Sequence, residues 1–163
     1  CMGERASTLD EAQSSLSEYR RTIATYMNWA TEKPERIEEL QSIYIIHGEE
    51  TIDENMTGAI STIMTSSGMF EPMKAIIVAA KTKEGELKIS ARATEPLLIA
   101  GINLGQILQE TATRHGGMGG GHDVAAGAEV PFEKAKEFLT ETDELIRKTL
   151  EVSKTESKDH NET

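Results

Sequence analysis

A run of glycines that ends in a histidine is the segment of this sequence best suited to chemistry. Residues 116 to 128 read GGMGGGHDVAAGA, with five glycines in the six positions before His122. Glycine loses more backbone entropy on folding than other residues, so such a run is typical of positive φ or close backbone approach. We interpret Gly119, Gly120, Gly121 and His122 as a phosphate-binding turn that lies outside the core, because amides and an imidazole can donate to phosphate oxygens.

Two common glycine fingerprints do not match this run. A P-loop requires Lys and Ser or Thr after its last glycine, whereas His122 and Asp123 follow here, and no register gives G-x-G-x-x-G. Those motifs also run from strand to loop to helix, while this run follows an expected helix and enters an expected strand. A flexible linker is the remaining alternative, but the flanking sequence is not polar and of low complexity.

An expected strand upstream carries a second group suited to phosphate. Residues 87 to 93 alternate between apolar side chains and the polar side chains Lys88, Ser90 and Arg92. The guanidinium of Arg92 can grip a phosphodiester with two hydrogen bonds, although a surface salt bridge is the alternative. Ser90 is a weaker candidate on the same face. Asn103 is a third candidate, but it is also expected to cap the next helix, and the two roles compete.

Three segments carry a resemblance to a known family. GGMGGGHDVAAGA, together with KISARAT (88–94) and GINLGQIL (101–108), resembles the C-terminal DHH-associated domain of the DHH phosphoesterases, most closely that of archaeal RecJ-like single-strand exonucleases. The resemblance covers residues 51 to 131, and it implies that Arg92 grips substrate phosphate. It also implies that the Mn²⁺ or Mg²⁺ centre lies in a preceding DHH domain. The C-terminal domain of alanyl-tRNA synthetase is a looser match, usually with arginine in place of His122.

Composition and charge limit the class of protein. The 163 residues suit one domain with a flanking helix, and the single cysteine, Cys1, excludes a disulfide framework and favours a reducing, cytoplasmic compartment. No stretch is long and apolar enough to suggest a membrane span, so no membrane partner is expected. A chain that opens on Cys1 is expected to be a fragment. The net charge of −11 argues against simple nucleic-acid binding, but residues 73 to 127 carry 6 basic and 5 acidic side chains.

Local patterns predict an α+β fold, an α/β sandwich around a mixed central sheet of about four or five strands, flanked by helices and preceded by a long N-terminal helix. Residues 1–41 are expected to form a helical connector, 42–152 the substrate-binding domain and 153–163 a disordered tail. Thr8 and Glu11 suggest a capping box for helix 8–32, whose heptad seam either packs on its own domain or forms a homodimer. The expected elements are helices at 8–32, 35–41, 51–65, 103–115 and from 131, and strands at 43–46, 75–80, 87–93 and 124–130.

These features predict a domain that binds and orients a substrate without cutting it. Asp53 and Asp123 are the only aspartates between Asp10 and Asp143, so no catalytic or metal-ligating residue is assigned and no cofactor is expected within this chain. The expected partners are single-stranded nucleic acid or a short oligonucleotide, the missing DHH domain, and replication or repair proteins. A scaffold domain in a replication or repair assembly and a tRNA-binding synthetase domain remain the alternatives.

Overall fold

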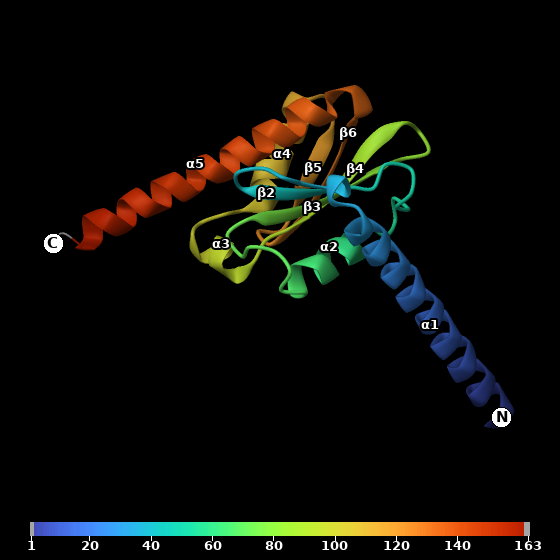
Figure 1. Cartoon of the computed structure of the whole chain (residues 1–163). Coiled ribbons are helices and arrows are strands. Elements are labelled where there is room, and N and C mark those ends of the chain that lie inside the picture. The colour runs from blue at the N-terminus through green and yellow to red at the C-terminus, as the bar shows by residue number, and fades with distance from the viewer. Residues whose placement is uncertain (1, 162–163) are drawn as a thin grey trace.

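The computed structural model describes the backbone from Met2 to Asn161, and side chains from Glu11 onward except Ser157 and those after Lys158. It contains a six-stranded mixed sheet with helices on both faces, which confirms the expected α+β class (Figure 1). The strands are β1 (Ile37–Glu39), β2 (Ile43–His47), β3 (Ala75–Lys81), β4 (Glu86–Arg92), β5 (Met118–Gly121) and β6 (Ala125–Pro131), in the order β1-β2-β3-β4-β6-β5. Only the pair β2 and β3 is parallel.

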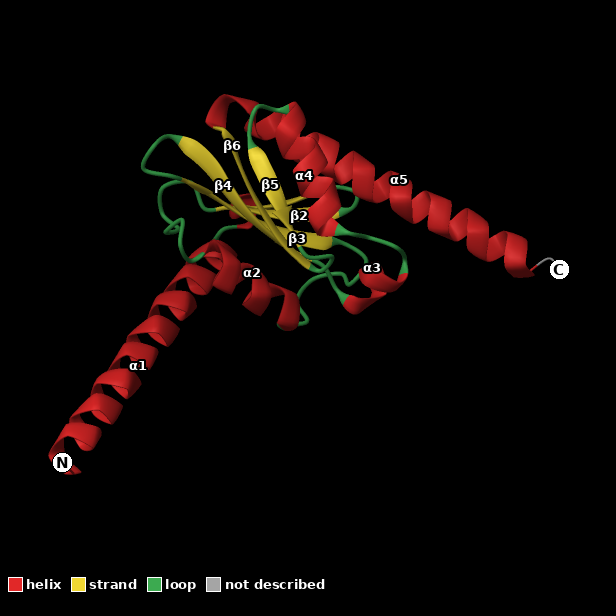
Figure 2. Ribbon diagram, turned by 180° about the vertical axis from the view of Figure 1, so that it is seen from behind, coloured by secondary structure: helices red, strands yellow, loops and turns green. Residues whose placement is uncertain are grey.

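Five α-helices surround this sheet (Figure 2). They are α1 (Met2–Glu32), α2 (Thr57–Ser66), α3 (Glu95–Ile99), α4 (Leu104–Arg114) and α5 (Ala135–Asn161), with 3₁₀ turns at Pro34–Arg36 and Phe132–Lys134. The period-2 alternation of the strands divides the core into two layers. Ile89 faces α4 and α5, where it packs in one cluster with Leu108 and Phe138. Val78 faces the other way, in a second cluster with Ala30 and Ile60.

Two expected helices differ from the sequence expectation: one is not an α-helix, and the other begins later. The segment expected to be a helix at 35–41 is a 3₁₀ turn followed by β1, because Ile37 pairs with Ile46 of β2 and packs on the second cluster. The helix expected from Thr51 begins only at Thr57. Gly48 donates its N–H to the carbonyl of Ala79, 2.8 Å away, so the chain turns here before α2 begins.

The glycine run is a strand rather than a loop. Met118–Gly121 forms β5, which pairs antiparallel with β6 at the edge of the sheet. Together with β1 it raises the number of strands above the expected four or five. The expected strand 124–130 does run alongside the expected strand 87–93, as the antiparallel pair β6 and β4.

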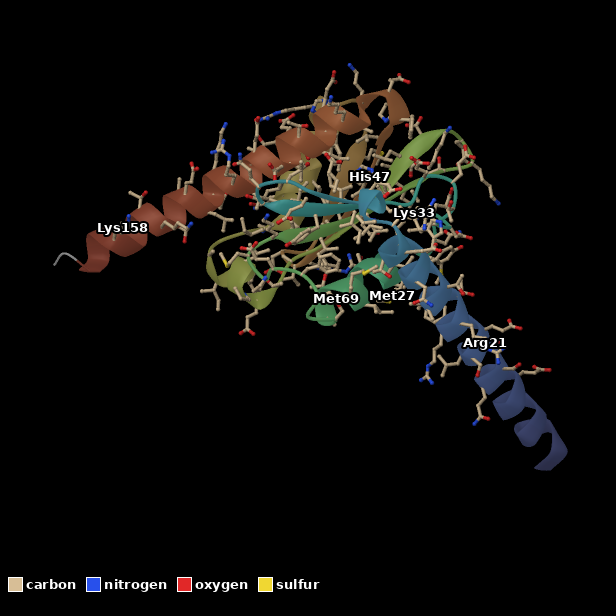
Figure 3. All side chains as sticks on the ribbon, in the orientation of Figure 1. Arg21, Met27, Lys33, His47, Met69 and Lys158 are labelled. Atoms are coloured by element: carbon tan, nitrogen blue, oxygen red, sulfur yellow. The ribbon has the colours of Figure 1, made fainter. Side chains whose placement is uncertain are left out.

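The two terminal helices extend away from the sheet in different directions (Figures 1 and 3). Helix α1 begins at Met2, so Thr8 lies inside it and does not cap its start. Its predicted seam packs on the domain only in its last turns, where Ile23 and Ala30 are buried, whereas Leu16 and Tyr19 are 47% and 46% exposed. Helix α5 continues to Asn161 through the segment expected to be disordered, and residues 162 and 163 lie outside the described residues.

Candidate phosphate-binding site

Arg92 lies at the end of β4, and its guanidinium faces α2. Nε donates to Thr62 Oγ1 at 3.0 Å, Nη1 to the Ala91 carbonyl at 2.9 Å, and Nη2 to the Gly58 carbonyl at 3.4 Å. Burial lowers the pKa of Arg92, and no carboxylate among the described side chains forms an ion pair with it. An arginine has five N–H donors, so one N–H on each terminal nitrogen stays available for a bidentate contact with an anion.

Ser90 is held by a structural hydrogen bond. Its hydroxyl is buried and lies 2.8 Å from Thr57 Oγ1, and the Thr57 hydroxyl donates in turn to the carbonyl of Glu54 at 3.3 Å. Either hydroxyl can donate in this pair, which joins β4 to α2. The Ser90 hydroxyl is therefore engaged with α2 in this structure.

The glycines of β5 allow α4 to approach the sheet closely. A Cβ on Gly105 of α4 would lie 2.4 Å from the Gly121 carbonyl oxygen, and one on Gly119 would lie 2.5 Å from the Leu108 carbonyl oxygen. Gly121 also has φ +140°, a conformation that side chains other than glycine rarely adopt. The run therefore lies outside the core, as expected, but it also has a packing role against α4 that the sequence did not predict. Gly120 differs from them, because a Cβ there would meet nothing within 4 Å.

The N-terminus of α4 is already capped by the protein. Asn103 Oδ1 accepts from the Gln106 N–H at 3.1 Å, as the sequence predicted. The N–H groups of Leu104 and Gly105 donate to the carbonyls of Asp123 and His122, both at 2.9 Å. These amides are the donors that a helix start would offer to a phosphate. The amides at the start of α4 are therefore already engaged within the protein.

His122 and Arg92 lie at the same end of the sheet, two strands apart. The exposed His122 donates its backbone N–H to the Ala125 carbonyl at 2.8 Å, and Ala125 is the register partner of Arg92. On the face that carries Ser90 and Arg92, the next positions outward are Ala125, Gly127 and Gly120, all partly exposed. Helix α2 packs on β3 and β4, and α4 packs on the opposite face of β5 and β6. Ala125, Gly127 and Gly120 thus form a surface of small residues beside Arg92.

The structure therefore brings some of the expected residues together and not others. Arg92 and Gly120 share one face, and the backbone of His122 lies at its end, whereas Asn103 is committed to the α4 cap on the other side of the sheet. Sequence reasoning missed Gly58 and Thr62, which contact Arg92 from α2. The sequence signal that could have drawn attention to them is the hydroxyl-rich stretch TGAISTIMTSS at 57–67.

Sequence comparison places this domain among known proteins. The DHHA1 domain model matches residues 43 to 148. The chain belongs to the DHHA1 family. An uncharacterized protein of Methanocaldococcus jannaschii is 32% identical over 136 residues, which is 83% of this chain but only 27% of that protein. The alanine–tRNA ligase of Bacillus pumilus is 36% identical over 78 residues, 47% of this chain and 9% of the ligase.

The DHHA1 fold recurs in solved structures. A pGpG-specific phosphodiesterase from Vibrio cholerae superposes with a TM-score of 0.52 at 15% identity, over 82% of this chain and 42% of that one. This DHHA1 chain thus spans less than half the length of these relatives. Among its described residues, no group of three or more His, Cys, Asp or Glu side chains could hold a metal ion. None of the described helices has the length and apolar character of a membrane span.

Proposed function

We propose that this DHHA1 domain binds the phosphodiester backbone of single-stranded nucleic acid or a short oligonucleotide for a RecJ-like DHH exonuclease. The Mn²⁺ or Mg²⁺ that cleaves the bond is held by a DHH domain outside this chain. The observation that carries the proposal is Arg92, a partly buried cation without a described carboxylate partner and with one N–H free on each terminal nitrogen. Burying a cation without a counter-ion costs free energy, and a bound phosphate offsets that cost.

The edge strand β5, two strands away from Arg92, supplies further donors. His122 and Ala125 form a hydrogen-bonded pair in the β5–β6 ladder, and such pairs alternate along an antiparallel ladder. The N–H groups of Gly119 and Gly121 consequently point away from β6, toward the free edge of the sheet. Phosphates along this edge would receive amide hydrogen bonds, with His122 at the end able to donate or to stack on a base.

A second candidate function is RNA binding, which the likeness to alanine–tRNA ligase over 47% of this chain favours. The two functions differ in their ligand. A nuclease domain is expected to bind short single strands through the phosphate backbone, whereas a tRNA-binding domain is expected to prefer folded tRNA. Competition between a labelled single-stranded oligonucleotide and tRNA separates them.

The direct test of the proposal is the substitution Arg92→Ala. Loss of a charge-assisted hydrogen-bonded contact should weaken binding of a fluorescent single-stranded oligonucleotide by about 1 to 3 kcal/mol, roughly fivefold to 150-fold, in anisotropy titrations at low salt. The slope of log K against log salt should fall by about 0.7, the value for one lost phosphate contact on a single strand.

His122→Ala should also weaken binding, because it removes a hydrogen-bond donor and a ring on which a base can stack. Arg147→Ala is the charge-matched control, since Arg147 is paired with Glu151 on α5 at 2.9 Å. Equal affinity of the wild type and Arg92→Ala would refute the proposed function.

A further inference from the structure

We infer that Thr62 and Gly58 of α2 are positioning residues that hold the Arg92 guanidinium in the orientation that binds phosphate. This inference rests on the proposed function of Arg92. Helix α2 lies directly against the strand that carries Arg92. The neighbouring residues of this helix serve the core: Ile60 and Met64 are fully buried, whereas Thr62 is exposed and Gly58 partly so. Packing alone therefore does not account for Thr62.

Thr62, Gly58 and Arg92 form a closed ring of hydrogen bonds. Arg92 Nε donates to Thr62 Oγ1 at 3.0 Å, the Thr62 hydroxyl donates to the Gly58 carbonyl at 3.0 Å, and Arg92 Nη2 donates to that same carbonyl at 3.4 Å. Two N–H groups of one planar guanidinium are thus fixed by acceptors on one turn of one helix. This arrangement sets the plane of the guanidinium and directs its remaining N–H groups before any ligand arrives. Less side-chain entropy is then lost on binding.

The two groups of α2 that accept hydrogen bonds from Arg92 are neutral, so they leave its positive charge available to an anion. A carboxylate at position 62 would hold Arg92 at least as firmly, but it would cancel the charge and compete with phosphate. A hydroxyl and a carbonyl orient the guanidinium and leave its full charge for the ligand. The ion pairs of Arg114 with Glu110 and Glu141 show the opposite arrangement in the same protein, where the cation is neutralised.

Gly58 leaves space for the close approach of Arg92 and Ser90. A Cβ at position 58 would lie 3.3 Å from Arg92 Nη2 and 3.7 Å from Ser90 Oγ. The first distance is tighter than ordinary contact, so the guanidinium would have to move by a few tenths of an ångström, which would disturb its long hydrogen bond to the Gly58 carbonyl. Glycine costs a helix up to about 1 kcal/mol relative to alanine. In exchange, glycine at position 58 allows α2 to lie close to Arg92.

The test uses the whole chain with Thr62→Val, which keeps the side-chain shape and removes the hydroxyl. We expect oligonucleotide affinity to fall about twofold to tenfold, the effect of one neutral hydrogen bond. The salt slope should stay at the wild-type value, because Arg92 keeps its charge and its phosphate contact. Thr62→Ser should restore affinity. Gly58→Ala should weaken binding without lowering the melting temperature.

Thr65→Val is the matched control, because the Thr65 hydroxyl donates only to the Ser61 carbonyl of its own helix, at 2.7 Å. A second readout needs no ligand: the NMR signal of the Arg92 Nε–H should exchange faster with solvent in Thr62→Val and remain unchanged in Thr65→Val. A purely structural role of Thr62 would instead lower the melting temperature together with affinity.

The outcomes separate this inference from the proposed function. If Arg92→Ala weakens binding and Thr62→Val does not, the positioning role is wrong and the proposed function stands. If Arg92→Ala binds like the wild type, the proposed function is wrong. The Nε–H exchange then still decides whether Thr62 holds the guanidinium, and an unchanged exchange rate would overturn the positioning role as well.

Discussion

Arg92 and Arg114 are both arginines but have different hydrogen-bond partners. Arg114 donates to Glu110 and Glu141, and the hydrogen bond to Glu141 is the main cause of its raised pKa. Arg92 has only neutral acceptors, and burial lowers its pKa. Arg114 therefore connects α4 to α5, whereas Arg92 has a charge without a described counter-ion beside the surface of small residues. At the scale of single residues, the absence of a described carboxylate beside Arg92 is what distinguishes a candidate binding group from a structural one.

The Glu141 carboxylate should make stability depend on pH. Burial alone would raise its pKa, but hydrogen bonds from Arg114 and from His115, 2.6 Å away, hold the pKa below its usual value. A lowered folded-state pKa contributes stability that is present above the unfolded value of about 4.3 and is lost as pH falls through the folded pKa. Glu141→Gln should therefore lower the free energy of unfolding by about 1 to 2 kcal/mol at pH 7.

The difference between the wild type and Glu141→Gln should shrink below about pH 4, as urea titrations across a pH series would show. Glu144→Gln, an exposed carboxylate of α5 without an ion pair in the described residues, is the control. A constant difference down to pH 3 would show that the charge of Glu141 is not what stabilises the fold.

At the scale of elements, the contact between α4 and β5 accounts for much of the glycine run. Gly119 and Gly121 on the strand and Gly105 on the helix leave no room for a Cβ. At the other end of α4, Gly116 adopts φ +77° and donates to the Thr113 carbonyl, while Gly117 donates to the Ala112 carbonyl at 2.8 Å. This is a Schellman motif. One glycine-rich segment therefore ends α4, forms the edge strand β5, and provides the surface on which α4 packs.

Gly105→Ala tests the importance of this close approach. In an isolated helix the change would stabilise by up to about 1 kcal/mol. Here the new methyl group would collide with the Gly121 carbonyl, so we expect a destabilisation of about 1 to 3 kcal/mol in chemical denaturation. Gln109→Ala, at an exposed position of α4, should change stability little. A stabilised Gly105→Ala variant would mean that α4 and β5 do not pack as closely as described.

At the scale of the whole molecule, net charge opposes the proposed ligand. The chain carries −11, while the segment 73–127 with the candidate site is close to neutral. A few phosphate contacts on an acidic protein supply little affinity at physiological salt. If the domain binds single strands as proposed, its affinity at physiological salt should be weak.

The same chain is expected to bind without cutting. Two-metal hydrolysis of a phosphodiester needs clustered ligands that hold ions about 4 Å apart, and the described residues contain no group of three that could hold one. Labelled single-stranded DNA and RNA should therefore stay intact after incubation with Mn²⁺, as a denaturing gel would show. Arg92→Ala serves as the comparison. Cleavage by the wild type that disappears in Arg92→Ala would place the catalytic site in this domain.

Local signals in the sequence determined the class of fold and several element ends. The alternation over 87–93 predicted β4 and which of its faces carries Arg92, and Asn103 with Gly116 predicted both ends of α4. These signals are short-range, since strand period and helix caps depend on neighbours within a few residues. The family resemblance added the expected order of the motifs.

Only the tertiary structure decided what the glycines and α2 do. Glycine has low strand propensity, so β5 exists because β6 pairs with it and α4 packs on it, and strand formation depends on such partners more than on intrinsic preference. The contact between Arg92 and Thr62 joins positions 30 residues apart, and the bond between Ser90 and Thr57 joins positions 33 apart. No local pattern encodes these pairings, because they arise from the packing of α2 on the sheet.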